Sequence, residues 1–354
     1  MKLTLHEANL PIRHPWTTTH GTRTHQRNLI VELADAGHSG FGEGASIPYY
    51  GVTFDTMSAA LESVRPQIEA ASFEEPAGFW ETLHPLLADQ MFALCALDEA
   101  AHDLWGKRLG KPVYELYGLD MRNAPLSDYT IGIDTLEKMV AKMQEFDGWP
   151  IYKIKLGTDD DIAIVRELRR HTGAVFRVDA NCGWDADQTI ANSHELAKLN
   201  VEFIEQPLVP EDWDGMKRVF AESALPVIAD ESCILEADVE KCVGFFHGVN
   251  VKLTKCGGQT PARRMLAHAR ELGLKTMVGC MTETTVGISA IAQLLPMLDY
   301  VDMDGALLLA GDVADGVTLD KGTVRFPTTP GAPGAPATPG APGNGITWRG
   351  MDNV

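Results

Sequence analysis

Short apolar runs that alternate with helical stretches, from about residue 126 onward, constrain the fold more than any other feature of the sequence. Eight runs follow one another: SDYTIGI, IYKIKLG, VFRVDAN, VEFIEQP, PVIADES, VNVKLT, KTMVGC and YVDMDG. Eight strand and helix units over roughly 180 residues predict an α/β fold, a modified (β/α) barrel with compact repeats. A doubly wound open sheet is the alternative, but no GxGxxG motif follows the first strand. In a barrel, chemistry is expected at the carboxyl ends of the strands.

The first part of the chain has a different pattern. Strand-like runs, KLTLHEANL and RNLIVELADAGHSGFGEG, come before a helical stretch, FALCALDEAAHDLWGKRLG, which we expect to end at Gly110, before Pro112. Strands followed by helices predict an α+β module. We therefore expect an α+β capping domain over residues 1–120, completed by the C-terminal segment 320–354, and a barrel catalytic domain over residues 121–319.

A Pro/Gly/Ala-rich run, PTTPGAPGAPATPGAPGNG, covers residues 327–345. It has no burial pattern, so we expect an exposed, extended loop there. The short ITWRG that follows is predicted to return as an edge strand of the N-terminal module.

Composition excludes several classes of partner and location. The formal charge of −19, from 49 acidic and 30 basic residues, argues against a nucleic acid or an anionic membrane surface as the main partner. Six cysteines without a CxxC pair favour reduced thiols and no structural zinc. The N-terminus lacks the apolar region of a signal peptide, and no apolar run reaches about 18 residues. A cytoplasmic location is therefore expected.

Three consecutive predicted strands end on a carboxylate, at Asp179, Glu205 and Asp230. The intervals, 205 − 179 = 26 and 230 − 205 = 25 residues, are about one strand and helix unit each, so the side chains should meet at one rim. Each acid alone could simply cap the next helix. Three together repel one another and favour a hard divalent cation such as Mg²⁺ between them. Asn181 is expected to orient a ligand from outside the coordination shell.

Lysines flank this predicted site. Lys153 and Lys155 lie two positions apart in one strand, so they share a face, which we expect to be the barrel mouth. An exposed salt-bridging pair is the alternative, but it is typical of open antiparallel sheets. In VNVKLTKC, the same parity makes Lys252 the inward residue and gives Lys255 a structural or loop role.

The two lysine strands should lie on opposite sides of the barrel, with the carboxylates between them. Burial and neighbouring cations depress a lysine pKa, and Lys153 is expected to act on Lys155 in this way. A metal that holds the substrate carboxylate stabilises the enediolate formed when the adjacent carbon loses its proton. A base on each face can therefore invert a stereocentre.

At these residues the sequence resembles the muconate-lactonizing subgroup of the enolase superfamily, in which lysine bases act with Mg²⁺. The KIK pair, DAN, EQP, ADES and NVKLTKCGG occur in the order of the family, and the resemblance covers nearly the whole chain. It implies a definite set of roles. These are Mg²⁺ ligands at Asp179, Glu205 and Asp230, an acid/base pair at Lys155 and Lys252, and assistance from Lys153.

The last strand distinguishes members of the subgroup, which include cycloisomerases, o-succinylbenzoate synthases and N-acylamino acid racemases. YVDMDG supplies Asp302 and Asp304, and this Asp-x-Asp is similar to that of the dipeptide epimerases, where both carboxylates hold the α-ammonium of the substrate. The alternative is an acid pair that caps or salt-bridges at the strand end. Two extra negative charges would serve the dianionic substrate of a cycloisomerase poorly.

Further resemblance lies in the predicted cap and near the ends of strands. HGTRTHQRNLIVEL is similar to the loop and strand of L-Ala-D/L-Glu epimerases, which implies that Arg23 meets the glutamate side chain of the substrate. GEGASIPYYG resembles the mobile loop that follows. GCMTET resembles the end of strand 7, which implies substrate contacts at Cys280 and Thr282, and Glu231 is expected behind the metal ligands.

The leading hypothesis is a Mg²⁺-dependent dipeptide epimerase whose partner is a small dipeptide, L-Ala-D/L-Glu from peptidoglycan turnover. The enzymatic alternatives are a racemase, a dehydratase, an o-succinylbenzoate synthase or a cycloisomerase of the same subgroup. A non-enzymatic binding protein is the third hypothesis, and it would not need bases on both sides of a carbon acid. The sequence leaves open whether the chain forms a homo-oligomer.

Overall fold

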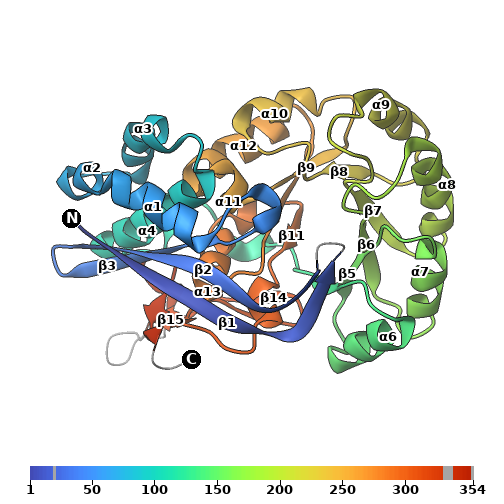
Figure 1. The fold of residues 1–354 in the computed structure, drawn as a ribbon, viewed down its shortest axis with the longest axis horizontal. Coiled ribbons are helices and arrows are strands. Elements are labelled where there is room, and N and C mark those ends of the chain that lie inside the picture. The colour runs from blue at the N-terminus through green and yellow to red at the C-terminus, as the bar shows by residue number, and fades with distance from the viewer. Residues whose placement is uncertain (19–20, 330–337, 352–354) are drawn as a thin grey trace.

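The computed structural model describes residues 1–18, 21–329 and 338–351, and its centre is an eight-stranded parallel sheet in the order β11-β10-β9-β8-β7-β6-β5-β4 (Figure 1). The strands are β4 (Tyr129–Ile131), β5 (Ile151–Lys155), β6 (Val175–Asp179), β7 (Val201–Glu205), β8 (Val227–Ala229), β9 (Gly248–Val251), β10 (Lys275–Gly279) and β11 (Tyr300–Asp302). A parallel bridge between Ser127 and Val301 brings the two edges together. The predicted barrel, nearly closed, is confirmed.

Helices cover the outside of this barrel (Figure 1). They are α6 (Leu136–Glu145), α7 (Asp161–Arg169), α8 (Ala186–Ala197), α9 (Trp213–Glu222), α10 (Glu236–Lys241), α11 (Leu253–Cys256), α12 (Gln259–Glu271) and α13 (Thr285–Ala292). Strand residues such as Ile154 and Val178 are fully buried and belong to one hydrophobic cluster with residues of these helices, for example Leu168. Alternate strand residues are thereby free to project into the barrel.

The N-terminal part is an antiparallel sheet with helices on one side. It comprises β1 (Lys2–Thr18), β2 (Gly21–Asp35), β3 (His38–Ala45), η1 (Pro48–Tyr50), α1 (Phe54–Ser63), α2 (Arg65–Ala70), α3 (Pro76–Leu87) and α4 (Met91–Leu109). Helix α4 ends at Gly110 in the left-handed region, as predicted. It lies directly on β3, because a Cβ atom at Gly42 would come within 2.1 Å of the Ala96 carbonyl oxygen. Short segments α5 (Val113–Leu116) and η2 (Met121–Asn123) lead to the barrel.

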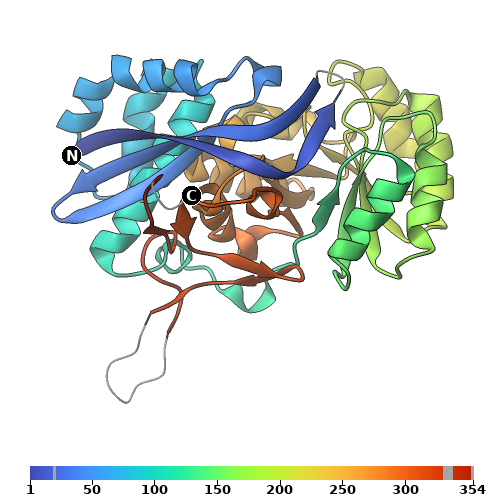
Figure 2. The ribbon, with the colours of Figure 1, turned by 60° about the horizontal axis from the view of Figure 1, so that its bottom comes forward.

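The C-terminal segment lies beside the capping strands (Figure 2). After η3 (Leu295–Met297) and η4 (Gly305–Leu308) it forms the short strands β12 (Ala314–Asp315), β13 (Thr318–Asp320), β14 (Thr323–Arg325), β15 (Thr328–Thr329), β16 (Thr338–Pro339) and β17 (Thr347–Trp348). The prediction that ITWRG forms an edge strand of the N-terminal module was wrong, since this segment contains β17, which pairs with β12. Its Trp348 ring instead stacks on Phe41 of β3, with ring centroids 5.1 Å apart.

The prediction of an exposed loop over residues 327–345 was wrong for its last part, while residues 330–337 lie outside the described residues. Asn344 is fully buried, and its backbone amide donates to Asp103 of α4 at 2.8 Å. Gln293, beside α13, donates to the Asn344 carbonyl oxygen at 3.1 Å. The last part of this glycine- and proline-rich segment therefore packs between the cap and the barrel. In the described part of the chain, every helix is too short or too polar to cross a membrane.

Candidate functional site

The three carboxylates predicted from the strand ends lie at one rim of the barrel. In the parallel register Asp179 is level with Glu205, and Asp230 directly follows β8. All three are fully buried. Burial, together with the negative charges of Asp179 and Asp230, raises the pKa of Glu205 to about 7. The three carboxylates therefore repel one another, as carboxylates in a cation-binding site do before the cation binds.

The buried ammonium group of Lys153 lies among these acids. Its Nζ is 3.1 Å from Asp179 Oδ2, 2.9 Å from Glu205 Oε2 and 2.8 Å from Asp302 Oδ2. Burial alone would lower the pKa of Lys153, but the surrounding carboxylates raise it well above its ordinary value. Lys153 therefore stays charged and holds the carboxylates of three strands together.

Lys155 is the more accessible lysine of β5, with 18% of its side chain exposed. Its Nζ lies 2.6 Å from Asp179 Oδ2 and 3.0 Å from Asn181 Oδ1. Asn181 has a φ of 43°, and this left-handed turn directs its side chain to both Lys155 and Glu231. The two residues expected behind the metal ligands, Asn181 and Glu231, thus contact each other, at 3.4 Å.

On the other side, Asp230 is held by two lysines. Lys252 Nζ lies 2.8 Å from Asp230 Oδ2, and Lys255 Nζ lies 2.5 Å from Oδ1. The structural role predicted for Lys255 agrees with this buried ion pair, whereas the prediction that it lies on the face away from the site was wrong. The chain begins α11 directly after Lys252, so residues three apart share a side, and a change from strand to helical period could have revealed this. Lys255 also lies 5.5 Å from the ring centroid of Tyr50 in η1.

Burial and neighbouring charges have opposite effects on the pKa of Lys252. Burial and the charge of Lys153 lower its pKa, but Asp230, Glu205 and Glu231 together raise it above its ordinary value. For Asp230 the balance is opposite. Burial would raise its pKa, and Lys252 and Lys255 bring it below its ordinary value. Sequence reasoning counted the neighbouring ammonium groups and missed how closely the carboxylates face them.

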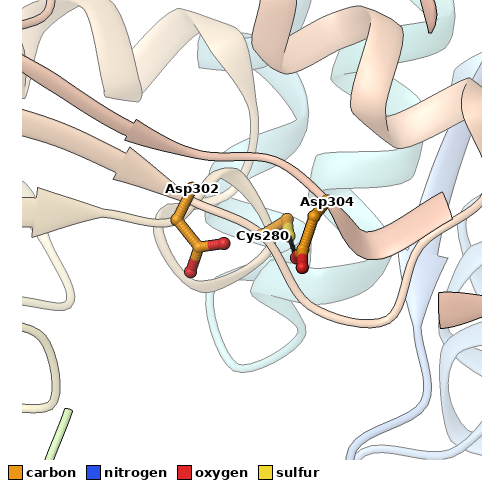
Figure 3. A group of neighbouring side chains, drawn as sticks. All are labelled: Cys280, Asp302 and Asp304. Carbon is orange, nitrogen blue, oxygen red and sulfur yellow. Dashed lines mark hydrogen bonds between the residues drawn. The ribbon is translucent and has the colours of Figure 1, made fainter. Parts of the chain in front are cut away.

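Cys280, Asp302 and Asp304 form a second cluster, at the ends of β10 and β11 (Figure 3). One ligand atom from each lies within 4.8 Å of the others, which within the described residues no other set of three such side chains achieves. Burial and the charge of Asp302 raise the pKa of Asp304 to about 7, and Asp304 Oδ2 accepts the Thr130 amide at 2.6 Å. Burial and acidic neighbours raise the pKa of the Cys280 thiol well above its ordinary value.

A protonated thiol is a poor ligand for a hard cation, whereas two nearby carboxylates attract an ammonium group. The cluster of Cys280, Asp302 and Asp304 therefore fits a substrate ammonium better than Mg²⁺. The set of Asp179, Glu205 and Asp230 offers buried carboxylate oxygens alone, which are the donors that a hard divalent cation prefers.

Two further predicted substrate contacts are Thr282, in the loop after β10, and Arg23, which lies in a strand and not in a loop. The carbonyl oxygen of Thr282, just past β10, accepts the Asn28 side-chain amide at 2.9 Å. Arg23 of β2 is half-buried, burial lowers its pKa, and its Nη1 donates to Gln26 Oε1 at 3.3 Å. Among the described residues Arg23 makes no ion pair, in contrast to Arg27, which pairs with Glu7 and Asp55.

Taken together, the strand order sets Lys155 on β5 and Lys252 next to β9, with β6, β7 and β8 between them. The carboxylates that follow or end those three strands therefore lie between the two lysines. A carbon acid bound over them would meet one amine from each side.

Comparisons with known proteins agree over nearly the whole chain. A family model for the mandelate racemase / muconate lactonizing enzyme N-terminal domain matches residues 1–118, and an enolase C-terminal domain-like model matches residues 135–351. The chain is 58% identical over 331 residues to an L-Ala-D/L-amino acid epimerase from Flavobacterium johnsoniae, covering 94% of this chain and 98% of that relative.

Two solved structures have the same fold. One is a substrate-liganded complex of the L-Ala-D/L-Glu epimerase from Bacillus subtilis, with a TM-score of 0.89 at 29% identity, covering 98% of this chain and 99% of the other. The second is a dipeptide epimerase from Methylococcus capsulatus with Mg and the dipeptide L-Arg-D-Lys. Its TM-score is 0.87 at 30% identity, with the same coverage of 98% and 99%.

Proposed function

The chain belongs to the mandelate racemase / muconate lactonizing enzyme family of the enolase superfamily, and from this premise we propose that it inverts the α-carbon of the C-terminal residue of dipeptides that begin with L-Ala. It is an isomerase, an epimerase that acts on dipeptides. The observation that carries the mechanism is the placement of Lys155 and Lys252 on opposite sides of three buried carboxylates.

In the proposed mechanism, Asp179, Glu205 and Asp230 hold Mg²⁺. When bound, the ion supplies positive charge that stabilises the substrate carboxylate as the adjacent carbon loses its proton. The dipeptide epimerase from Methylococcus capsulatus, which binds Mg together with a dipeptide, supports this assignment. Lys153, buried and charged, keeps Asp179 and Glu205 in position.

The two remaining lysines transfer the proton. Lys155, partly exposed at the mouth, takes the α-proton from one face. Lys252, whose pKa is raised by Asp230, is protonated and donates to the opposite face. In the reverse direction their roles exchange, so the same pair converts either epimer.

We assign the free α-ammonium of the dipeptide to Asp302 and Asp304. Both side chains are almost completely buried, and Asp302 Oδ1 has no hydrogen-bond partner among the described residues. An N-acylated amino acid would leave these charges unpaired, at a cost that disfavours an N-acylamino acid racemase.

For the second residue we propose glutamate as one accepted side chain, since a guanidinium such as that of Arg23 grips a carboxylate in a bidentate manner. The Bacillus subtilis enzyme is named for this substrate. The broader name of the Flavobacterium johnsoniae relative supports acceptance of other amino acids as well.

A dipeptide library in D₂O with Mg²⁺ tests the proposal. Mass spectrometry and chiral chromatography should show deuterium at the α-carbon and epimerisation of L-Ala-L-Glu. Exchange in N-acylated amino acids but not in dipeptides would favour the racemase, and exchange in no compound would favour a binding protein.

A further inference from the structure

Two buried polar side chains, those of Gln26 and Asn28, connect Arg23 of β2 with the loop after β10. Arg23 Nη1 donates to Gln26 Oε1 at 3.3 Å, and Gln26 Nε2 donates to Asn28 Oδ1 at 2.7 Å. Asn28 Nδ2 then donates to the carbonyl oxygen of Thr282 at 2.9 Å. We call Arg23, Gln26, Asn28 and Thr282 the polar relay. It runs from the capping sheet to the end of barrel strand β10.

The centre of the relay lies on one face of β2, whereas Arg23 has the parity of the opposite face and reaches Gln26 with its long side chain. Gln26 and Asn28 lie two positions apart, so they share a face, and only 2% and 1% of their surfaces are exposed. Arg27 lies on the opposite face, where it pairs with Glu7 and Asp55. Gln26 and Asn28 therefore lie on the face of β2 that is turned toward the barrel, and Arg27 lies on the other face.

Asn28 has a single allowed orientation. Its Nδ2 donates to Glu43 Oε1 at 2.6 Å as well as to Thr282, and its Oδ1 accepts from Gln26 and from the Ser46 amide at 3.2 Å. Reversal of the amide would bring its oxygen against a carboxylate and a carbonyl oxygen, and its NH₂ against two donors. Every contact of the side chain thus fixes the same rotamer.

Glu43 anchors the barrel end of the relay. It accepts the Thr284 amide at 2.9 Å, the Thr284 hydroxyl at 2.6 Å and the Gly287 amide at 3.0 Å, all at the start of α13. The loop from Cys280 to Thr284 is consequently held by the cap as well as by its own strand. Displacement of β2 relative to the barrel would move this loop.

We propose that Asn28 is a positioning residue that determines substrate specificity. Through Gln26 it fixes the guanidinium of Arg23, proposed to contact the second residue, and through Thr282 it fixes the end of β10 beside Cys280 and the proposed ammonium site, so one amide sets the position of both. This inference rests on the proposed function. It predicts that breaking the relay weakens the preference for an acidic second residue while proton transfer by the lysines continues.

Two variants test it. Gln26→Leu removes the connection between Arg23 and Asn28, and Asn28→Asp removes both donors to Glu43 and Thr282. Each should lower the ratio of kcat/KM for L-Ala-L-Glu to that for L-Ala-L-Leu by about fivefold or more, mainly through KM. In an Arg23→Ala background Gln26→Leu should change the ratio no further. If Asn28→Asp does not fold, Gln26→Leu alone decides.

Thr260→Val is the matched control. Thr260 Oγ1 donates to Asp98 at 2.7 Å, a buried cap-to-barrel contact outside the relay. This variant should lower Tm and leave the ratio unchanged. An unchanged ratio in a folded Gln26→Leu variant overturns the inference but leaves the proposed function standing. A native enzyme that exchanges no dipeptide overturns both.

Discussion

Lys155 and Asp179 end neighbouring strands of the barrel, and the Lys155 ammonium lies 2.6 Å from Asp179 Oδ2. Across the barrel, Lys252 lies 2.8 Å from Asp230, which follows the adjacent strand. Each candidate base is thus held by a carboxylate from the next strand. The reach of each amine toward a bound substrate is fixed by that partner.

Because each lysine serves one face of the α-carbon, the two should be separable by stereochemistry. Lys155→Ala and Lys252→Ala should each abolish epimerisation, while one variant still exchanges the α-proton of a single epimer with solvent. Deuterium incorporation into L-Ala-L-Glu and L-Ala-D-Glu, followed by mass spectrometry, measures this. Normal epimerisation by either variant would rule out the two-base mechanism, and Lys275→Ala, a change at an exposed lysine of β10, is the control.

Removal of the Glu205 charge should abolish turnover and leave the fold intact. Glu205→Gln keeps an oxygen toward Lys153 and relieves the repulsion from Asp179 and Asp230. Circular dichroism should show a cooperative melt at or above the native Tm, with no epimerisation. Glu202→Gln, on the same strand but paired with Arg177, should remain active. Full activity of native protein after EDTA treatment would contradict the metal assignment.

Substrate binding should depend on the ionisation of Asp304. Its pKa is raised to about 7, so the side chain is neutral below that pH and attracts an α-ammonium only above it. KM for L-Ala-L-Glu should therefore fall as the pH rises from about 6 to about 7.5, below the range in which the substrate ammonium itself loses its proton. Initial rates across this range test the effect. Asp304→Asn should show a higher KM without the pH step, and a step of equal size in that variant would assign it to another group.

Lys255 should stabilise the fold through Asp230. Lys255→Met leaves Asp230 Oδ1 without its buried partner, which should lower the free energy of unfolding by about 3 kcal/mol. Urea unfolding of EDTA-treated protein measures this value. Lys198→Met, which breaks an exposed pair with Glu195, should cause no measurable change. Equal stability of the two variants would show that Lys252 alone neutralises Asp230.

Arg23 should select the acidic side chain. Arg23→Ala should lower kcat/KM for L-Ala-L-Glu, with a loss of about 2 to 4 kcal/mol of transition-state stabilisation. It should leave kcat/KM for L-Ala-L-Ala nearly unchanged. Steady-state kinetics on both dipeptides give the difference. Arg27→Ala is the control, since its guanidinium is engaged by Glu7 and Asp55. An equal loss on both substrates would mean that Arg23 supports the loop only.

The local sequence pattern was sufficient to predict the barrel and to predict that Asp179, Glu205 and Asp230 lie close together. Apolar strand runs bury themselves, and parallel strands bring their carboxyl ends to one rim. It failed for the side on which Lys255 lies, because the backbone changes from strand to helix at Lys252. It also could not reveal Glu43 and Thr284, which meet across 241 residues of sequence through packing of the cap on the barrel.

The burial of Asn344 bears on the order in which the molecule is assembled. Its side chain reaches the Glu99 carbonyl oxygen of α4, made 245 residues earlier in synthesis, and its amide reaches Asp103. The last barrel strand, β11, ends at Asp302, so the whole barrel is synthesised before Asn344 can close this junction. A truncation before residue 344 would release a chain that contains every proposed site residue and yet lacks one of the contacts between cap and barrel.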